Sequence, residues 1–295
     1  MRRKKVCFVG YGSTEYSRKS EASVLWYYAE AIRDALRQTG LHKKDIRGLS
    51  ITTQVSPDYS PHVAEQLGLE VDWVLNGDYG GGGGVMSVRR AADAIECGHV
   101  DLAVLVGGNS FDRSTPTQRQ LEYQRGNFVD VYGYGGPNSL MALIQRLHMD
   151  QYGTTLEQIG KIAIAQRENA VNNPQALFRE PMSMQDYLNS RMISDPIRLF
   201  DCVMPCSGAE CVVLASEERA KQITDKPVYL VTDAEISHYQ VANMLPDKTT
   251  FGMKVVGERI FSEVKHKDID LLEIYDDYPI AVMIQIEDLG FCKKG

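Results

Sequence analysis

A run of glycines stands where a ligand could come close to the polypeptide backbone. Residues 80–84 are five consecutive glycines, between the apolar segment Trp73–Asn76 and a stretch of helical periodicity that begins at Val85. Glycine lets a ligand approach the main chain, and the free N–H groups at the start of a helix bind anions or oxyanions. The run lacks the Gly-Lys-Ser/Thr of a P-loop, and the dinucleotide pattern G-x-G-x-x-G matches trivially inside any glycine run. A flexible loop is one interpretation, but the position after a strand favours a substrate-binding site. The residues of this predicted site are Gly81, Gly82, Gly83 and Gly84.

A tyrosine near the end of the chain is the second candidate for chemistry. Tyr275 directly follows the apolar segment Ile269–Ile274, at the carboxyl end of a predicted strand, where open α/β sheets place their sites. Its hydroxyl can transfer a proton, although a phenol with a pKa near 10 is a poor base unless its surroundings lower that pKa. A packing role is also compatible with the sequence, beside a helix capped by Asp277 with Pro279 in its first turn. The residues alone leave both interpretations open.

Apolar strands and amphipathic helices alternate along the chain and would position these candidates. The alternation predicts an α/β fold with a largely parallel sheet. Gly40 is expected to end the first helix. Strands are predicted at 6–9, 46–51, 73–76, 102–106, 211–214 and 228–231, and helices at 22–38, 61–67, 85–97, 138–150, 155–171, 253–264 and 280–289.

One short stretch of sequence occurs twice. Lys44–Ile51 and Lys267–Ile274 share the pattern Lys-Asp-Ile-x-x-Leu-x-Ile, and each copy follows a predicted strand and an amphipathic helix. This order of elements predicts a duplicated βαβ unit whose second half is incomplete. The first half would comprise residues 1–225, including a polar loop domain at about 111–200, and the partial second half residues 226–295.

Composition excludes several classes of protein. Apolar residues make up 43% and charged residues 24% of the 295 residues, which is typical of a globular protein with a buried core. The net charge of −7 argues against nucleic-acid binding, and no apolar run approaches the roughly 20 residues of a membrane span. No secretory signal is recognised, so the six cysteines are expected to be reduced thiols in the cytoplasm. Cys202, Cys206 and Cys211 lack the spacing of a metal site, and no metal is predicted.

Several motifs together resemble the thiolase superfamily, in its lipid-transfer-protein (sterol-carrier-type) branch. The resemblance extends from Val6 to Gly295. It implies a thiolase-like fold of duplicated βαβ units in five layers, α/β/α/β/α, with the second half incomplete. It also implies a homodimer that binds an acyl-CoA thioester, with coenzyme A as part of the substrate and no separate cofactor. The motifs are Asn172-Asn173-Pro174, Asn189-Ser190-Arg191 with Asp195–Cys202, and Ile286–Cys292.

Two departures from the thiolase pattern indicate the chemistry. Gly81 stands where thiolases carry the nucleophilic cysteine, and Tyr275 stands where many relatives carry the histidine of a His-Asp motif. In both respects the chain is similar to the steroid side-chain aldolases of this branch. The resemblance thus implies retro-aldol cleavage of a β-hydroxyacyl-CoA in lipid metabolism, with Tyr275 catalytic, in complex with a small zinc-ribbon/OB-fold (DUF35-type) protein. In those aldolases a second catalytic tyrosine lies further along, in a part without a counterpart here.

Two alternatives remain open from the sequence. One is a thiolase-type acyltransferase subunit that makes or breaks a β-ketoacyl-CoA, and the other is a non-catalytic scaffold that binds acyl-CoA. The missing cysteine at position 81 counts against the first, and the presence of Tyr275 counts against the second. For the glycine run, we expect that Gly82→Val or Gly83→Val stops turnover while the protein stays folded.

Overall fold

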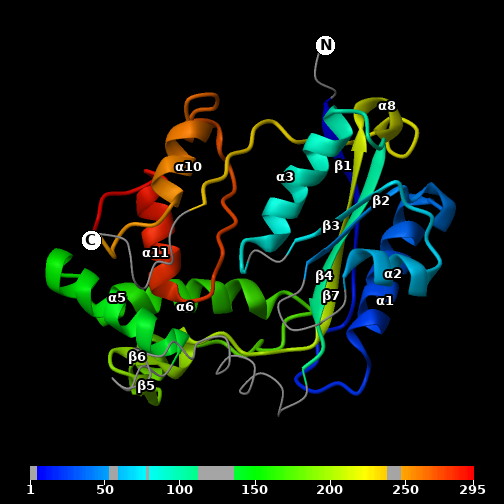
Figure 1. Ribbon diagram of the computed structural model, residues 1–295. Coiled ribbons are helices and arrows are strands. Elements are labelled where there is room, and N and C mark those ends of the chain that lie inside the picture. The colour runs from blue at the N-terminus through cyan, green and yellow to red at the C-terminus, as the bar shows by residue number, and fades with distance from the viewer. Residues whose placement is uncertain (1–4, 53–58, 78–79, 112–135, 238–246) are drawn as a thin grey trace, which may run out of the picture. The chain divides into compact units, whose positions relative to one another are not determined.

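The chain forms two compact units in a computed structural model that describes residues 5–52, 59–77, 80–111, 136–237 and 247–295 (Figure 1). Unit 1 comprises Met1–Pro116 and Pro205–Asp233, and unit 2 comprises Thr117–Met204 and Ala234–Gly295. The boundary expected near residue 225 divides the chain between the two halves of the internal repeat, whereas these two units are defined by contacts between residues. That boundary stays a prediction.

Unit 1 is built on a six-stranded sheet with the order β3-β2-β4-β7-β1-β8. β2 pairs in parallel with β3 and β4, whereas β7 runs antiparallel between β4 and β1. The expectation of a largely parallel sheet was therefore wrong. β7 begins opposite the last residue of β4 (Asn109 opposite Gly208), so the chain re-enters the sheet at the edge where it left and must run the other way. The strands are β1 (Val6–Ser13), β2 (Gly48–Thr52), β3 (Trp73–Asn76), β4 (Leu102–Asn109), β7 (Gly208–Ser216) and β8 (Val228–Tyr229).

Helices cover both faces of this sheet. On one face α1 (Val24–Thr39) and α2 (Ser60–Leu67) pack over the sheet, with the short α8 (Glu217–Ala220) beside them, and α3 (Gly83–Glu96) covers the other face (Figure 1). Side chains of a strand alternate between its two faces. Along β4, for example, Val104 joins the core under α1 and Leu105 joins the core under α3.

The first helix begins and ends at residues suited to those positions. The Ser23 side chain accepts a hydrogen bond from the Trp26 N–H at the start of α1. Gly40 adopts the left-handed conformation (φ 70°) at its end, which confirms the expected stop.

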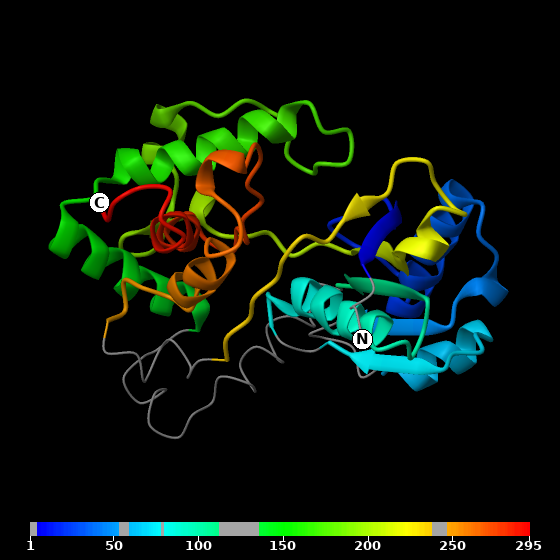
Figure 2. The same ribbon diagram turned by 90° about the horizontal axis from the view of Figure 1, so that it is seen from above.

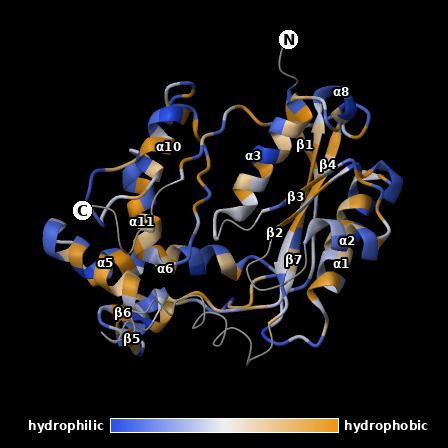
Figure 3. Cartoon of the chain, in the orientation of Figure 1, coloured by the Kyte–Doolittle hydropathy of each residue, from blue (hydrophilic) through white to orange (hydrophobic). Residues whose placement is uncertain are grey.

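Unit 2 is mainly helical. Its core joins α11 to α5, α6 and α7 through buried residues such as Ile144, Ile159 and Ile284. The Tyr278 backbone takes the N-cap position of α11, so the expectation that Asp277 caps this helix was wrong. The helices show hydrophobic and hydrophilic residues on different faces (Figure 3). The elements are α5 (Pro137–Tyr152), α6 (Leu156–Val171), α7 (Met184–Asn189), β5 (Met192–Ser194), β6 (Ile197–Arg198), η3 (Leu199–Asp201), α10 (Met253–Ile260), η4 (His266–Asp268) and α11 (Pro279–Asp288).

The internal repeat is visible in the structure, but only in part. A 3₁₀ helix opens each copy, η1 (Lys43–Asp45) in the first and η4 in the second. The first copy continues into strand β2. The predicted strand Ile269–Ile274 is not formed, because no described strand lies beside it and a β-strand depends on such pairing.

The other sequence-based elements agree closely with the structure. The strand predicted at 228–231 is reduced to the two residues of β8. Figure 2 looks nearly along the strands of unit 1 and shows α3 on one side of the sheet and α1 on the other. Among the described helices, none is both long enough and apolar enough to cross a bilayer.

Candidate functional site

The glycine run follows the carboxyl end of β3, at one edge of the sheet in unit 1. β2, β3 and β4 are parallel, and β1 shares their direction because both β1 and β4 run antiparallel to β7. The carboxyl ends of these four strands therefore meet at one edge, the usual place for a ligand site in an open α/β sheet. The run leads from that edge into the N-terminus of α3, which starts at Gly83.

Two glycines of this segment serve packing. A Cβ at Gly83 would lie 2.5 Å from the Gly77 carbonyl oxygen and 2.7 Å from the Thr52 Cγ2 atom. A Cβ at Gly77 would lie 2.1 Å from the Ser87 Oγ atom. The absence of side chains thus brings α3 close to the ends of β2 and β3. Gly83 is buried in this contact, and nothing in the sequence distinguishes it from its neighbours.

The remaining three glycines of the predicted site are exposed. Gly81, Gly82 and Gly84 face solvent, and a Cβ at Gly84 would have no atom within 4 Å. At Gly82 the nearest atom would be the Met86 sulfur, at 4.0 Å. The first-turn N–H groups of a helix have no partner within the helix and carry the positive end of its dipole. This exposed turn can therefore receive a carbonyl or enolate oxygen.

Other polar residues at the same edge were not predicted from the sequence. The Thr52 and Ser87 hydroxyls lie 3.0 Å apart below the run. Beyond the end of β1, the Tyr16 hydroxyl donates a hydrogen bond to the carboxylate of Glu210 on β7. Burial raises the pKa of Glu210 above its usual value. Thr52 directly follows the strand predicted at 46–51 and is the last residue of β2, so its place at the carboxyl end of a strand was the available signal. The Tyr16–Glu210 contact joins residues 194 apart and left no local signal.

Tyr275 lies in unit 2, on the segment before α11. Its side chain is 50% exposed, and its hydroxyl has no hydrogen-bond partner among the described residues. The buried Gln285 side chain donates a hydrogen bond of 2.8 Å to the Tyr275 carbonyl and so ties this segment to α11. Burial, followed by the charges of Asp277 and Asp276, raises the pKa of Tyr275 to about 12. Tyr275 is therefore a protonated phenol at neutral pH, able to donate a proton but not suited to be a base.

A buried polar group lies three residues after Tyr275 in the sequence. The Tyr278 hydroxyl donates a hydrogen bond of 2.5 Å to the Asn138 side-chain oxygen, near the start of α5. The Cys202 thiol also points to this oxygen, at 3.6 Å. Asn138 therefore connects α5, the segment after η3 and the N-terminus of α11, and holds the loop that carries Tyr275.

Burial shifts five thiols of the described chain away from the reactive thiolate form. Burial, and next the charge of Asp201, raises the pKa of Cys202 to about 11. A nucleophilic cysteine needs the opposite shift, toward the thiolate. Among the described residues there is also no group of three or more side chains able to hold a metal ion. Burial raises the pKa of four further thiols, Cys7, Cys206, Cys211 and Cys292.

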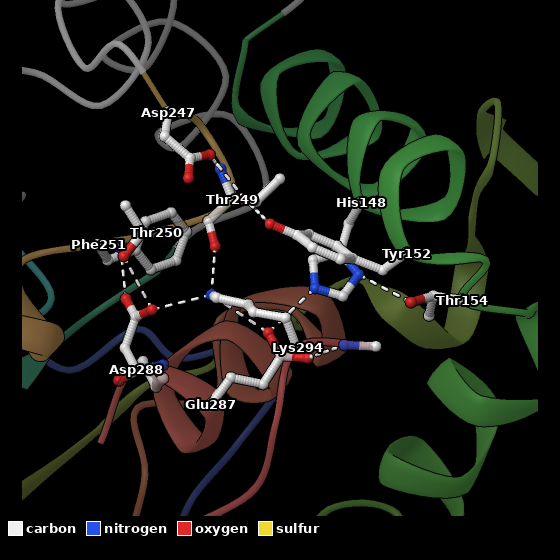
Figure 4. A network of polar contacts seen from close by, with 12 residues as sticks. His148, Tyr152, Thr154, Asp247, Thr249, Thr250, Phe251, Glu287, Asp288 and Lys294 are labelled. Atoms are coloured by element: carbon white, nitrogen blue, oxygen red, sulfur yellow. Dashed lines mark hydrogen bonds and ion pairs between the residues drawn. The ribbon is translucent and has the colours of Figure 1, made fainter. Parts of the chain in front are cut away.

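A network of buried charges anchors the C-terminal residues to α11 (Figure 4). The Lys294 ammonium lies between two carboxylates, 2.8 Å from Asp288 and 3.2 Å from Glu287. Glu287 also accepts hydrogen bonds from His148 Nε2 at 3.0 Å and from the Gly295 N–H at 2.8 Å. Both carboxylates are buried, so their partners offset the cost of removing charges from water.

The same network extends to α5 and to residues 247–251. His148 is fully buried, with its Nε2 atom 3.0 Å from the Glu287 carboxylate and its Nδ1 atom 2.8 Å from the Thr154 hydroxyl. Asp288 accepts hydrogen bonds from the Thr250 hydroxyl and the Phe251 N–H. The network thereby fixes the position of α11, whose opposite end carries the Tyr275 segment.

We expect Glu287→Gln to lower the free energy of unfolding at pH 7 by about 2 kcal/mol, since it weakens hydrogen bonds from charged or buried donors. Burial opposes the charge of Glu287, but the hydrogen bonds from His148 and Gly295 and the nearby cations hold its pKa below the usual value. A lowered pKa contributes stability above the unfolded-state pKa, roughly 4.3, that is lost as the pH falls through the folded-state pKa. The difference between wild type and variant should therefore shrink in acid.

Urea unfolding at pH 7 and in acid measures this difference. Glu258→Gln, at an exposed position on α10, is the matched control and should unfold as wild type does. An equal stability of Glu287→Gln and wild type at pH 7 would contradict a stabilising role for the network.

Comparison with known proteins places this geometry in a family. The family described as "Thiolase C-terminal domain-like" matches residues 234–295. The 17-hydroxy-3-oxo-4-pregnene-20-carboxyl-CoA lyase of Mycobacterium tuberculosis is 31% identical over 310 residues, covering 97% of this chain and 79% of the lyase. The steroid side-chain-cleaving aldolase of Thermomonospora curvata is 29% identical, over 97% of this chain and 78% of the aldolase.

Solved structures agree with the sequence comparison. The solved structure of an "Ltp2-ChsH2(DUF35) aldolase" matches with a TM-score of 0.89 at 29% identity, covering 98% of this chain and 77% of that chain. An SCP2-thiolase-like protein of Mycobacterium smegmatis shares the fold, with a TM-score of 0.77 at 17% identity, over 97% of this chain and 63% of its own. The expected resemblance is thereby confirmed: the chain belongs to the thiolase superfamily, in the sterol-carrier-protein (SCP2) type branch that includes the steroid side-chain aldolases.

Proposed function

We propose that this chain is the thiolase-like subunit of an acyl-CoA lyase that cleaves a β-hydroxyacyl-CoA by a retro-aldol reaction. The proposal is carried by Gly81, an exposed glycine in the turn at the N-terminus of α3, which the resemblance equates with the position of the thiolase nucleophile. Two relatives are named as a lyase and an aldolase, which supports the same reaction class.

The reaction needs no covalent intermediate with the enzyme. A base removes the proton of the β-hydroxyl group, and the bond between the α and β carbons breaks. The β carbon becomes the carbon of an aldehyde or ketone, and the electron pair of the broken bond forms the enolate of the shortened acyl-CoA. A proton delivered to the α carbon completes the second product. The enzyme must therefore accept the hydroxyl proton, stabilise an enolate oxygen and supply a proton to the α carbon.

The predicted site residues suit the last two of these tasks. The exposed turn at Gly82 and Gly84, at the start of α3, would offer backbone N–H groups to the enolate oxygen, with Gly81 beside it, whereas Gly83 holds α3 against the sheet. Tyr275, with a pKa of about 12, suits proton donation to the enolate. The sequence suggested a role for Tyr275 as a base, but its raised pKa makes donation the better assignment.

Partners and location complete the proposal. Coenzyme A enters as part of the substrate. A small zinc-ribbon/OB-fold protein of the DUF35 type is the expected partner from the resemblance, and the Ltp2-ChsH2(DUF35) aldolase supports a partner of the DUF35 type. A homodimer, a cytoplasmic location and a steroid-like acyl group are further parts of the proposal. Size-exclusion chromatography with light scattering, with and without the DUF35-type subunit, tests the assembly.

One assay separates the candidate functions. With the partner present, the chain is offered a β-hydroxyacyl-CoA without free coenzyme A, and separately a β-ketoacyl-CoA with free coenzyme A. A lyase releases a carbonyl product and a shortened acyl-CoA in the first reaction only. Thiolysis in the second reaction would favour the acyltransferase alternative, and binding without turnover in either would favour a scaffold.

A further inference from the structure

A carboxylate lies on the same face of the unit 1 sheet as the glycine run. Side chains along a strand alternate between its two faces, so Glu210, Val212 and Leu214 of β7 share one face. Val212 and Leu214 pack in the core under α3, which places Glu210 on the face that α3 covers. Glu210 pairs with Ser13, the last residue of β1, and its side chain is exposed. It therefore lies at the edge where the carboxyl ends of the parallel strands meet, within reach of a substrate.

A row of paired residues connects Glu210 to the first turn of α3. Thr52 on β2 pairs with Gly107 on β4, and Gly107 pairs with Glu210 on β7. The Thr52 side chain contacts the start of α3, where a Cβ at Gly83 would lie 2.7 Å from its Cγ2 atom. Neighbouring strands are about 4.8 Å apart, so the backbones of Thr52 and Glu210 are roughly 10 Å apart. Gly107 contributes no side chain between the carboxylate and the turn that is proposed to bind the enolate oxygen.

A tyrosine holds the Glu210 carboxylate in place. The Tyr16 hydroxyl donates a hydrogen bond to it, and the Tyr16 ring covers Gly208, where a Cβ would lie 2.5 Å from the ring. Burial raises the pKa of Tyr16 above its usual value, so this hydroxyl stays protonated and remains a donor. A carboxylate has two oxygens and about four acceptor sites, so Glu210 can accept a further proton while Tyr16 is bound to it.

The surroundings of Glu210 make it a better proton acceptor than an ordinary carboxylate. Burial raises its pKa, the Tyr16 hydrogen bond opposes this shift, and the charge of Asp34 on α1 adds to it. The thiols nearby on the same segment, Cys206 and Cys211, have raised pKa values and are neutral at pH 7. A raised pKa brings a carboxylate closer to the operating pH, where a general base is most effective.

We propose that Glu210 is the general base that accepts the β-hydroxyl proton of the substrate, with Tyr16 as its positioning residue. The assignment rests on the proposed lyase function and supplies the proton acceptor that the glycine run and Tyr275 do not provide. The enolate oxygen would bind at the start of α3, and the β-hydroxyl group would point along the row toward Glu210. Two hydrogen bonds of about 2.8 Å and the Glu210 side chain span most of the roughly 10 Å between the two positions.

The proton and the electron pairs balance in this step. The β-hydroxyl proton passes to the Glu210 carboxylate, and the electron pair of the O–H bond forms the carbonyl of the aldehyde or ketone. The bond between the α and β carbons breaks, and its electron pair forms the enolate. Glu210 afterwards returns its proton to solvent, to which its side chain is exposed.

Glu210→Gln tests the assignment. Glutamine keeps the size of the side chain and an oxygen that accepts the Tyr16 hydrogen bond, but it is no base. With the DUF35-type subunit present, kcat for cleavage of a steroid-like β-hydroxyacyl-CoA should fall roughly 10²–10⁴-fold at nearly constant KM. Glu210→Asp keeps a carboxylate and should retain more activity than Glu210→Gln. Glu65→Gln, at an exposed position on α2, is the matched control and should turn over as wild type does.

Hydrogen exchange at the α carbon separates the base from the rest of the site. The groups that protonate the enolate also exchange the α proton of the shortened acyl-CoA in heavy water, and this step involves no β-hydroxyl group. Glu210→Gln should therefore keep wild-type exchange while it loses cleavage, whereas Tyr275→Phe should lose both. Mass spectrometry of the shortened acyl-CoA measures the deuterium uptake, and circular dichroism verifies folding.

The pH profile of Tyr16→Phe tests the positioning residue. The Tyr16 hydrogen bond lowers the pKa of Glu210, so its removal should raise that pKa. A base acts in its deprotonated form, so below its pKa the rate rises about tenfold for each pH unit. This acidic limb should move to higher pH in Tyr16→Phe and should be absent in Glu210→Gln. A lower melting temperature with an unshifted limb would show that Tyr16 serves stability alone.

Different outcomes would overturn the assignment and the function on which it rests. Normal cleavage by Glu210→Gln would remove Glu210 from the mechanism. Equal loss of cleavage and exchange in this variant would make Glu210 a structural residue that only anchors Tyr16. A wild-type complex that does not cleave the β-hydroxyacyl-CoA would refute the proposed function itself, and the assignment of Glu210 would fall with it.

Discussion

Replacing Tyr275 with phenylalanine is expected to lower kcat by roughly 10²–10⁴-fold, the range typical of a general acid or base. The Tyr275 hydroxyl has no hydrogen-bond partner among the described residues, and half of the side chain is exposed. Its removal should therefore change the melting temperature very little. Because the lost interaction acts mainly in the transition state, KM should also stay nearly constant. Steady-state kinetics and thermal unfolding of the purified variant measure both quantities.

The pH profile separates a proton donor from a base. A donor with a pKa of about 12 stays protonated at ordinary pH, so Tyr275 should add no rise to the activity of the wild type between neutral and mildly alkaline pH. A base with the same pKa would make the rate increase about tenfold for each pH unit. Tyr11→Phe, at a tyrosine 59% exposed on β1, is the control and should retain normal turnover. Normal kcat in Tyr275→Phe would remove Tyr275 from the mechanism.

Local patterns in the sequence predicted most helices and strands, because the period and the ends of such an element depend on residues close together in the chain. The amphipathic period of α1 and the glycine that ends it are examples, and β3 was located at its observed bounds. The failures concern relations between distant segments. The direction of β7 depends on the edge at which the chain re-enters the sheet. Ile269–Ile274 has the same pattern as the segment around β2, but pattern alone does not supply the neighbouring strands that make a strand.

The candidate site was predictable to a similar extent. Composition indicated the glycine run, but only the packing of Gly83 against Gly77 and Thr52 separates a structural glycine from exposed ones. The contacts that support Tyr275 join distant residues, such as Asn138 with Tyr278, which are 140 positions apart. The pKa of Tyr275 depends on burial and on two neighbouring carboxylates, so the direction of its shift required the structure.

The effect of a side chain in the glycine run should depend sharply on position. At Gly82 the backbone is in the right-handed helical region (φ −78°, ψ −3°), and an added Cβ would meet only the Met86 sulfur at 4.0 Å. Gly82→Val should therefore fold normally. Its branched side chain would extend into solvent at the start of α3, where the proposal places the enolate oxygen. Turnover should fall at least about 10²-fold, as when an oxyanion-binding donor is lost.

Gly83→Val should behave differently, which corrects the expectation that both variants stay folded. Its Cβ would lie 2.5 Å from the Gly77 carbonyl oxygen, closer than real Cβ contacts allow, so the end of β3 or the start of α3 must shift. We expect a lower melting temperature together with lost activity. Val85→Ala, which shortens a side chain 78% exposed in the same helical turn, is the control that should leave both quantities unchanged. If Gly82→Val turns over substrate normally at an unchanged melting temperature, the enolate does not bind at this turn, and the five glycines serve only the close packing of α3 against the sheet.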